Sequence, residues 1–405
     1  MPSHGLIYDL AQRPVDLVAP VVDVVKVEFE LGHSMAVLPD CGATQADGVA
    51  RSPRRGRTLE MPSLGACLIV RDGGPALPVC LTSLDGVIDV IVVVDTGSVD
   101  DSVAIARHLG ARVVEWAWRD DFAAARNVAL EHCRTEWVLS IDADEVAAIG
   151  GGLHERLARA PEEIDAYAIE IELDADRRSG GILWHREAKL FRRERVRWQG
   201  RIHERVVRVN GAPLRVEPIE ARVVRLLHGG YGDDETIRMK AARNARLAEL
   251  EITDLRRRAT NAGELLRARF ELARSQFGAG SNGAARASFE AIIKELDAGP
   301  YRLWAWDFLA RLALRANQPE EAFGPISEIE QAAPGSSYAI WLQALALVAS
   351  GRSKEASVLL DGLEHVSDLA GRPLGDGALA QLRRYLADEA LGGTSGSAES
   401  VSPPQ

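Results

Sequence analysis

Cysteines, aromatic residues and long hydrophobic runs are all scarce in this 405-residue sequence. The four cysteines, Cys41, Cys67, Cys80 and Cys133, show neither CxxC nor any other metal-ligand spacing, which argues against a cysteine-based metal or disulfide scaffold and favours a reducing compartment. No apolar stretch reaches the roughly 18–20 residues of a membrane-spanning helix, and the N-terminal MPSHGLIYDL has no signal-peptide pattern. We therefore expect a cytoplasmic protein without a membrane span.

The sequence also has no excess of positively charged residues. The formal net charge is −11 at pH 7, so a general nucleic-acid-binding surface is not expected, although a local basic patch could still meet a phosphorylated ligand. The hydrophobic share of 46% and the charged share of 26% are ordinary for a soluble globular protein. The length is enough for two or three domains.

Composition divides the chain into five parts. The first contains a connector-like stretch, CGATQADGVARSPRRGRT, and we assign it no function, while the last, LGGTSGSAESVSPPQ, has the composition of a disordered tail. Between them we expect an α/β domain, a long linking helix and a helical repeat domain. The expected bounds are 1–62 for the extension, 63–232 for the α/β domain, 233–261 for the helix, 262–390 for the repeats and 391–405 for the tail.

The α/β domain is predicted from apolar runs that alternate with short helical patterns. LGACLIV, DVIVVV, ARVVEW and EWVLSI have strand length, and DDSVAIARHLG and DDFAAARNVALEHC between them are typical of helices. Strands apolar on both faces indicate a parallel sheet, and the period-two pattern of residues 166–228 indicates an antiparallel extension of it. Since ligands bind beyond the carboxyl ends of such strands, we expect Arg71/Asp72, Asp95–Ser98 and Asp142–Glu145 to converge on one crevice.

The stretch WVLSIDADE, residues 137–145, ends a predicted buried strand with three carboxylates in four residues. Asp142 and Asp144 are spaced Asp-x-Asp on one tight turn, so both can reach one divalent ion, and Mg²⁺ or Mn²⁺ keeps open positions for phosphate oxygens. An isolated Asp-x-Asp is common, and a solvated turn is the simpler alternative.

The C-terminal part carries an internal repeat. SNGAARASFEAII, NQPEEAFGPISEI and GRSKEASVLLDGL each place a small residue after a breaker cluster, at Ala287, Ala322 and Ala356, which are 35 and 34 residues apart. Tetratricopeptide (TPR) repeats have a 34-residue period with small residues where the paired helices cross. We therefore expect an all-α, TPR-like domain.

The blocks IVRDG, CLTSL, IDVIVVVDTGSVDDSVAIA, WRDDFAAARNVAL and EWVLSIDADE follow one another as in the nucleotide-sugar-binding half of family 2 glycosyltransferases. KLFRRERVRWQGRIHERV and LLHGGY resemble later blocks of a bacterial branch that carries C-terminal tetratricopeptide repeats. The resemblance covers about residues 64–360, and the branch includes enzymes that glycosylate Cys or Ser of bacteriocin peptides. It implies a GT-A fold, a Rossmann-like mixed sheet, followed by helical repeats.

The resemblance also implies an activity and its requirements. The chain would be a metal-dependent, inverting glycosyltransferase that moves a sugar from a nucleotide-sugar, a UDP-sugar foremost, to a peptide or protein side chain or a glycan. Mn²⁺ or Mg²⁺ would be the cofactor. The repeats would present a curved surface to a peptide or protein acceptor, or serve to form a homodimer.

The resemblance assigns donor and metal contacts residue by residue. Asp95 resembles the carboxylate that contacts uracil, although Thr96 stands where many members have a second Asp, and Arg126 resembles the arginine that reaches the nucleotide. Asp144 is the expected direct metal ligand, with Asp142 reaching the ribose or a metal-bound water and His228 as a further ligand. The expected donor-binding residues are Val70, Asp95, Arg126, Asp142, Ala143 and Asp144, and the expected metal ligands are Asp144, Asp142 and His228.

The expected base lies in the block Gly200-Arg201-Ile202-His203-Glu204. Glu204 would take the proton from the acceptor hydroxyl or thiol. Many members have Glu-Asp here, so His203 is a competing base, and a structural salt bridge of Glu204 with Arg201 or Arg205 is the simpler alternative.

Two other functions compete with glycosyl transfer. Nucleotidyl transfer also uses paired aspartates on an α/β sheet, but no G-x-G-x-x-[RK]-like loop follows the first strand. A partner-binding scaffold with a degenerate nucleotide-binding domain is the alternative outside enzymes. The retention of Asp142, Asp144 and Glu204 favours the enzyme.

Overall fold

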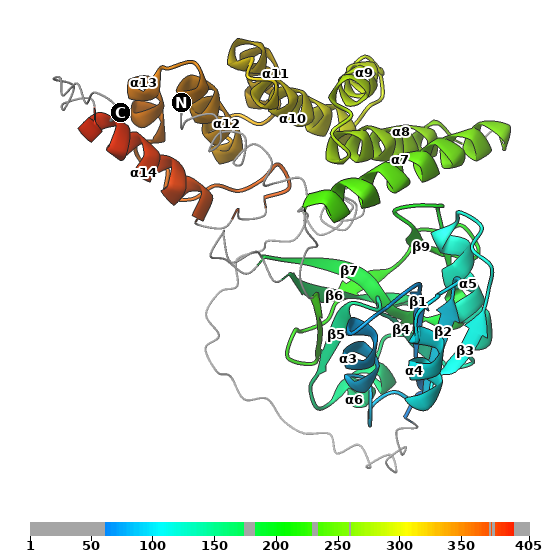
Figure 1. Ribbon diagram of the computed structural model, residues 1–405. Helices are drawn as coiled ribbons and strands as arrows, with labels where there is room; N and C mark the ends of the chain where they lie inside the picture. The colour runs from blue at the N-terminus through cyan, green and yellow to red at the C-terminus, as the bar shows by residue number, and fades with distance from the viewer. Residues whose placement is uncertain are drawn as a thin grey trace, which may run out of the picture.

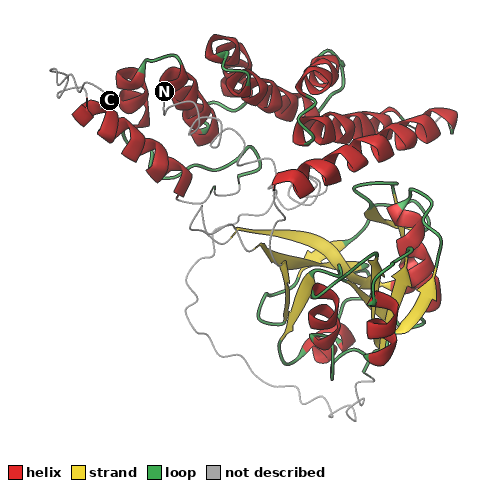
Figure 2. Cartoon of the chain, viewed as in Figure 1, coloured by secondary structure: helices red, strands yellow, loops and turns green. Residues whose placement is uncertain are grey.

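The computed structural model describes residues 61–173, 183–228, 234–258, 261–371, 374 and 377–392. The expectations for the N-terminal extension up to residue 60 and for the tail from residue 393 lie outside these residues. In the described part, a domain built around a β-sheet is followed by a row of helices (Figures 1 and 2).

The sheet domain contains one large mixed sheet. Its strands are β1 (Leu64–Val70), β2 (Val90–Asp95), β3 (Arg112–Glu115), β4 (Trp137–Ser140), β5 (Glu145–Ile149), β6 (Ala166–Leu173), β7 (Leu183–Arg192), β10 (Val216–Pro218) and β11 (Val224–His228). Among the described residues their order is β3-β2-β1-β4-β7-β6-β11-β5, with β10 beside β6. Strands β3, β2, β1 and β4 run parallel, and β7 pairs antiparallel with both β4 and β6. The predicted parallel sheet is confirmed. Its extension is antiparallel at β7, as predicted, but β10 and β11 both pair parallel with β6, so the prediction of a wholly antiparallel extension was wrong.

Both faces of the parallel strands are covered, as their continuous apolar sequences require. Neighbouring residues of β1 enter separate cores, Leu68 with Val93 and Cys67 with Val92, because successive side chains of a strand point to opposite faces. The short helices of this domain are α3 (Ala76–Thr82), α4 (Ser102–His108), α5 (Phe122–His132), α6 (Leu153–Ala158) and the 3₁₀ turn η2 (Arg193–Arg195). A separate hairpin pairs β8 (Val196–Gln199) with β9 (Arg205–Arg208).

The second domain consists of helices that each contact the next along the chain. They are α7 (Asp234–Arg257), α8 (Ala262–Gly278), α9 (Asn282–Ile293), α10 (Pro300–Arg315), α11 (Pro319–Ala332), α12 (Ser337–Ala349), α13 (Ser353–Leu360) and α14 (Gly377–Gly392). Pro300 and Pro319 stand at helix starts, where a missing backbone N–H costs nothing. The predicted all-α domain after the sheet is confirmed.

The repeat alanines are placed correctly in two cases of three. Ala322 and Ala356, each the fourth residue of its helix, are fully buried. The corresponding residue of α9 is Ala285, which is also fully buried, whereas Ala287 is exposed. The alignment was wrong by two residues there because ARASFEA offers small residues at several adjacent positions. Across the described ranges, no helix combines the length and apolar character needed to cross a membrane.

Candidate active site

The DADE turn joins β4 to β5 and is closed by its own last residue. Glu145 Oε2 accepts from the backbone N–H of Asp142 at 2.8 Å, and the N–H of Glu145 donates back to the Asp142 carbonyl at 3.0 Å. The Glu145 side chain is buried. The third carboxylate of the cluster is therefore part of the turn's structure.

Lys189 on β7 neutralises the inner side of the turn. Its Nζ lies 2.9 Å from Asp142 Oδ2 and 2.7 Å from Glu145 Oε1. Burial would lower the pKa of Lys189, but the two carboxylates outweigh it and hold that pKa above its usual range. Sequence reasoning missed this residue. The signal was a lysine in the apolar strand stretch AKLF, since a buried ammonium needs carboxylate partners.

Arg126 on α5 joins the two halves of the expected site. Its Nη2 lies 2.6 Å from Asp142 Oδ1 and its Nε lies 2.6 Å from Glu204 Oε1. The guanidinium also lies over the ring of Trp198, 4.9 Å from the centroid. Arg126 is thus not a surface residue of a helix, and it is a salt-bridge partner of Glu204. The neighbouring Arg201 and Arg205 pair with Asp254 and Glu264.

Charge and burial set the ionisation of these carboxylates. Burial opposes ionisation of Asp142, yet Arg126 and Lys189 outweigh it and hold the pKa of Asp142 far below its usual range. Burial also raises the pKa of Glu204, and Arg126 offsets only part of that rise. The Asp142 carboxylate is therefore kept ionised, while the Glu204 carboxylate is made more basic. A higher pKa suits a group that accepts a proton.

Asp144 lies at the open side of the turn. Its side chain is 45% exposed, and its Oδ1 lies 3.8 Å from Nδ1 of His228. His228 reaches this place because β11 pairs with β5 in a register that sets it opposite Glu145. Within the described ranges, no three His, Cys, Asp or Glu side chains gather as a ready metal site. A carboxylate and an imidazole do provide two donors of the types that Mn²⁺ or Mg²⁺ accepts, if substrate phosphates supply the others.

Asp95 ends β2 with its carboxylate held by its own loop. Its oxygens accept from the backbone N–H groups of Gly97 at 3.1 Å and Ser98 at 3.2 Å. Thr96 donates to the Val70 carbonyl from both its backbone N–H, at 2.9 Å, and its hydroxyl, at 3.0 Å. Thr96 therefore fixes the ends of β1 and β2 side by side. Ala143, between the two aspartates of the turn, packs partly buried against the sheet core.

His203 faces the helical domain. Its Nδ1 lies 2.9 Å from Arg274 Nη2, and its Nε2 lies 3.4 Å from Glu271 Oε2, both on α8. Burial lowers the pKa of His203 to about 4, helped by Arg274, Arg267 and Arg243 and opposed by Glu271. The imidazole is neutral at pH 7 and contacts α8, whereas Glu204 contacts Arg126.

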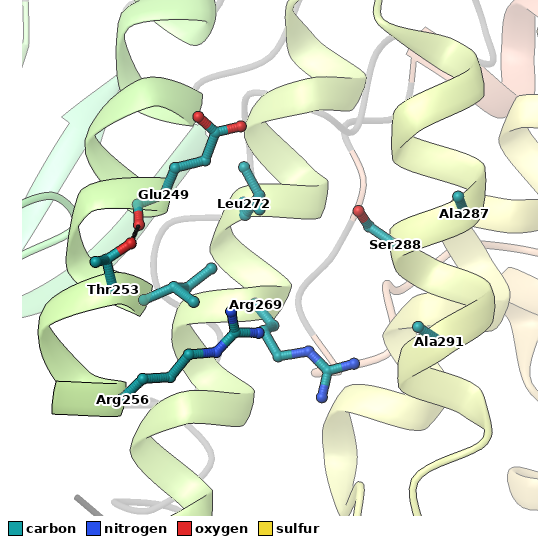
Figure 3. Close-up of a pocket in the computed structure, with 9 residues that line it drawn as sticks. Glu249, Thr253, Arg256, Arg269, Leu272, Ala287, Ser288 and Ala291 are labelled. Atoms are coloured by element: carbon teal, nitrogen blue, oxygen red, sulfur yellow. Dashed lines mark hydrogen bonds between the residues drawn. The ribbon is translucent and has the colours of Figure 1, made fainter. Parts of the chain in front are cut away.

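A separate cleft of about 430 Å³ lies in the helical domain between α7, α8 and α9. Figure 3 shows Glu249 at one end of it and Arg256 with Arg269 at the other. Leu272 lines this cleft and also packs against the apolar cluster around Ile202, beside the Glu204 loop. The cleft and the loop thus share one helix.

Two curated proteins match part of this sequence. A TPR repeat-containing protein of Synechococcus elongatus is 34% identical over 181 residues, which is 43% of this chain and 44% of that protein. The SPbeta prophage-derived glycosyltransferase SunS of Bacillus subtilis is 26% identical over 196 residues, 47% of this chain and 45% of that protein. The chain thus spans less than half the length of these curated relatives.

Solved structures and a family model complete the comparison. The mannosyltransferase PcManGT from Pyrobaculum calidifontis, solved in complex with GDP-Man and Mn²⁺, is 17% identical with a TM-score of 0.36 and covers 78% of this chain and 97% of its own. The model described as glycosyl transferase family 2 matches residues 67–206, a segment that includes Asp95, Arg126, Asp142 and Glu204. Residues 67–206 therefore match the family 2 glycosyltransferase model, and the helical domain follows this segment.

Proposed function

We propose that this protein is a metal-dependent, inverting glycosyltransferase that moves a sugar from a nucleotide-sugar, most simply a UDP-sugar, to a peptide or protein side chain or a glycan. The observation that carries the proposal is the Asp142–Arg126–Glu204 contact. The family resemblance assigns these residues to the donor side and to the acceptor side, and the fold brings all three together at 2.6 Å from segments 16 and 78 residues apart.

The charge balance of the site supports a cationic cofactor. Three carboxylates, those of Asp142, Glu145 and Glu204, contact two cationic side chains, those of Arg126 and Lys189, and a fourth, that of Asp144, lies beside His228. Asp144 and His228 would hold Mn²⁺ or Mg²⁺, while Asp142, whose two oxygens are engaged by Arg126 and Lys189, would face the ribose. The bound ion would stabilise the charge of the departing diphosphate.

Glu204 would act as the base. Its carboxylate takes the proton from the acceptor O–H or S–H, the acceptor atom forms a bond to the anomeric carbon, and the bond from that carbon to the diphosphate oxygen breaks. The nucleoside diphosphate leaves with the bonding electrons. In-line attack inverts the anomeric centre. Burial raises the pKa of Glu204, which favours proton uptake. Once Glu204 is protonated, Arg126 would pair with the phosphates of the donor instead.

The helical domain would receive the acceptor. The α7–α9 cleft offers apolar walls with acidic and basic groups at opposite ends, which suits a short peptide that carries both charges. Homodimer formation through the same helices is the alternative use of this surface.

The test is donor hydrolysis with the full chain. UDP-glucose, UDP-N-acetylglucosamine and GDP-mannose are incubated with the protein and Mn²⁺, and released sugar is measured for the wild type and for Glu204→Gln. We expect the wild type to hydrolyse one donor and the variant to lose at least a hundredfold in kcat, as general-base catalysis contributes about 10²–10⁴, with UDP affinity kept. Wild-type levels of turnover in the variant would contradict the base assignment. Absence of turnover and of nucleotide binding in the wild type would favour the partner-binding scaffold.

A further inference from the structure

The loop that carries Glu204 is covered by the first two helices of the second domain. Gly200 has φ of +106°, and a Cβ at this position would lie 3.4 Å from Glu251 Oε1 on α7 and 3.5 Å from Arg267 Nη2 on α8. His203 has φ of +49°, a left-handed conformation that non-glycine residues adopt rarely and that surrounding contacts must hold.

Contacts from both helices hold the loop's other residues. The side chain of Arg201 pairs with Asp254 at 2.6 Å, and Ile202 packs on Leu247 and Ala248, all three partners being on α7. Arg205 pairs with Glu264 on α8.

Buried charges between the two helices reinforce this cover. Glu251 of α7 accepts from the backbone N–H of Arg201 at 3.1 Å and pairs with Arg267 of α8 at 2.8 Å. Arg267 also donates to the His203 carbonyl at 3.5 Å. The loop backbone is therefore tied to α7 and α8 on both sides of Ile202.

His203, the residue directly before Glu204, is held by α8. Its side chain is 20% exposed and lies against Glu271 and Arg274, whose side chains are 4% and 9% exposed and pair at 2.7 Å. The next residue turns its carboxylate to Arg126 of the sheet domain. Adjacent residues thus attach to different domains, and the position of one fixes the position of the other.

From this arrangement we infer that α7 and α8 are a structural part of the transferase site, and that Arg274 and Glu271 act through His203 as positioning residues for Glu204. The inference rests on the proposed function and deepens it. The helical domain then does more than offer a surface to the acceptor, because it holds the base. His203 is on this basis an anchor rather than a second base.

The experiment uses the full chain with Arg274→Met, Arg274→Lys and, as a matched control, Arg286→Met. Arg286 of α9 pairs with Glu321 of α11 at 3.2 Å, so its loss removes an Arg–Glu pair without touching the loop, although that pair is more exposed, with side chains 34% and 49% exposed against 9% and 4% for Arg274 and Glu271. Two quantities are measured: kcat and KM for donor hydrolysis with Mn²⁺, and hydrogen exchange of residues 196–208 by mass spectrometry.

We expect Arg274→Met to lower kcat at least tenfold, to leave the donor KM within threefold, and to speed exchange across the loop. Arg274→Lys should recover part of kcat, and Arg286→Met should match the wild type in both measurements. A kcat within twofold of the wild type, or unchanged loop exchange, would overturn the inference. Should Arg274→Met fail to fold, Glu271→Gln keeps the side-chain shape and gives the same two measurements.

Failure of the proposed function gives a different pattern. If the wild type neither hydrolyses a donor nor binds UDP or GDP, the proposed function is wrong, and the inferred effect of Arg274 and Glu271 on kcat is wrong with it. The exchange measurement still decides whether α8 anchors the loop.

Discussion

Two buried charge networks, one in each domain, are built differently. In the helical domain Arg311 pairs with Asp307 one turn earlier in α10 at 3.2 Å, and Tyr338 of α12 donates to the same carboxylate at 2.8 Å. These three residues are at most 1% exposed. In the sheet domain, Arg126 and Lys189 each bridge carboxylates from segments far apart in the chain, and Asp142 among them is 35% exposed.

The two networks differ in whether a ligand can reach them. The Asp307 network is fully buried, so a ligand has no access to it. The Arg126 network has more carboxylates than cations and is open at Asp144, so an added cation would complete it.

Arg311→Met should have the largest effect on stability. Removing the guanidinium leaves Asp307 as a buried carboxylate without its ion-pair partner, which costs about 3–5 kcal/mol. Urea unfolding measures this, and calorimetry on the folded variant should find nucleotide affinity unchanged. A loss below about 1 kcal/mol would mean that the network contributes little to the fold.

Arg126→Met should cost less stability but abolish turnover. Two carboxylates lose a shared charged hydrogen-bond donor, at about 1.5–3 kcal/mol for such bonds, in a site that water partly reaches. Donor hydrolysis should fall below detection. Arg126→Lys should not restore it, because an ammonium cannot reproduce the two-sided contact. Turnover close to the wild type in either variant would contradict the bridging role.

Asp144→Ala should change binding without changing stability. A half-exposed side chain contributes within about 0.5 kcal/mol to folding, while loss of a metal ligand should weaken UDP binding in Mn²⁺ at least tenfold, about 1.4 kcal/mol. The exposed Asp85 serves as control, and Asp85→Ala should bind UDP normally. Equal UDP affinity in Asp144→Ala and the wild type would remove Asp144 from the metal site.

His203→Asn should reduce the loss in the free energy of unfolding that occurs at acidic pH. Because the pKa of His203 is about 4 in the folded protein and about 6.5 when unfolded, the unfolded chain takes up a proton that the folded chain does not between these values. Wild-type stability therefore falls as pH drops from about 6.5 towards 4, by about 1–2 kcal/mol at pH 5. The variant lacks this loss and tolerates positive φ as Asn. Identical urea midpoints against pH for both proteins would contradict the lowered pKa.

Much of the fold could be predicted from the sequence because its signals are local. Continuous β-branched runs predict buried parallel strands, and the strand ends locate the DADE turn and Asp95. The same locality limits the prediction of the repeats, since Ala285 and Ala287 are equally good candidates until packing selects Ala285.

The support of the site could not be predicted in this way. Lys189 is 44 residues from Glu145, and Arg274 is 71 residues from His203. Such contacts arise from β4–β7 pairing and from the docking of α8, and no spacing in the sequence encodes either. Family resemblance names the ligand-facing residues, but the residues that hold them in place depend on tertiary structure.

The most direct test of the central claim is calorimetric titration of UDP and of GDP into the full chain, once with Mn²⁺ and once with EDTA. We predict micromolar binding of one nucleotide that requires the metal, because Asp144 and His228 offer two metal donors beside a turn whose carboxylates outnumber their cationic partners. Failure of both nucleotides to bind with Mn²⁺ would contradict the claim and leave the DADE turn with a structural role only.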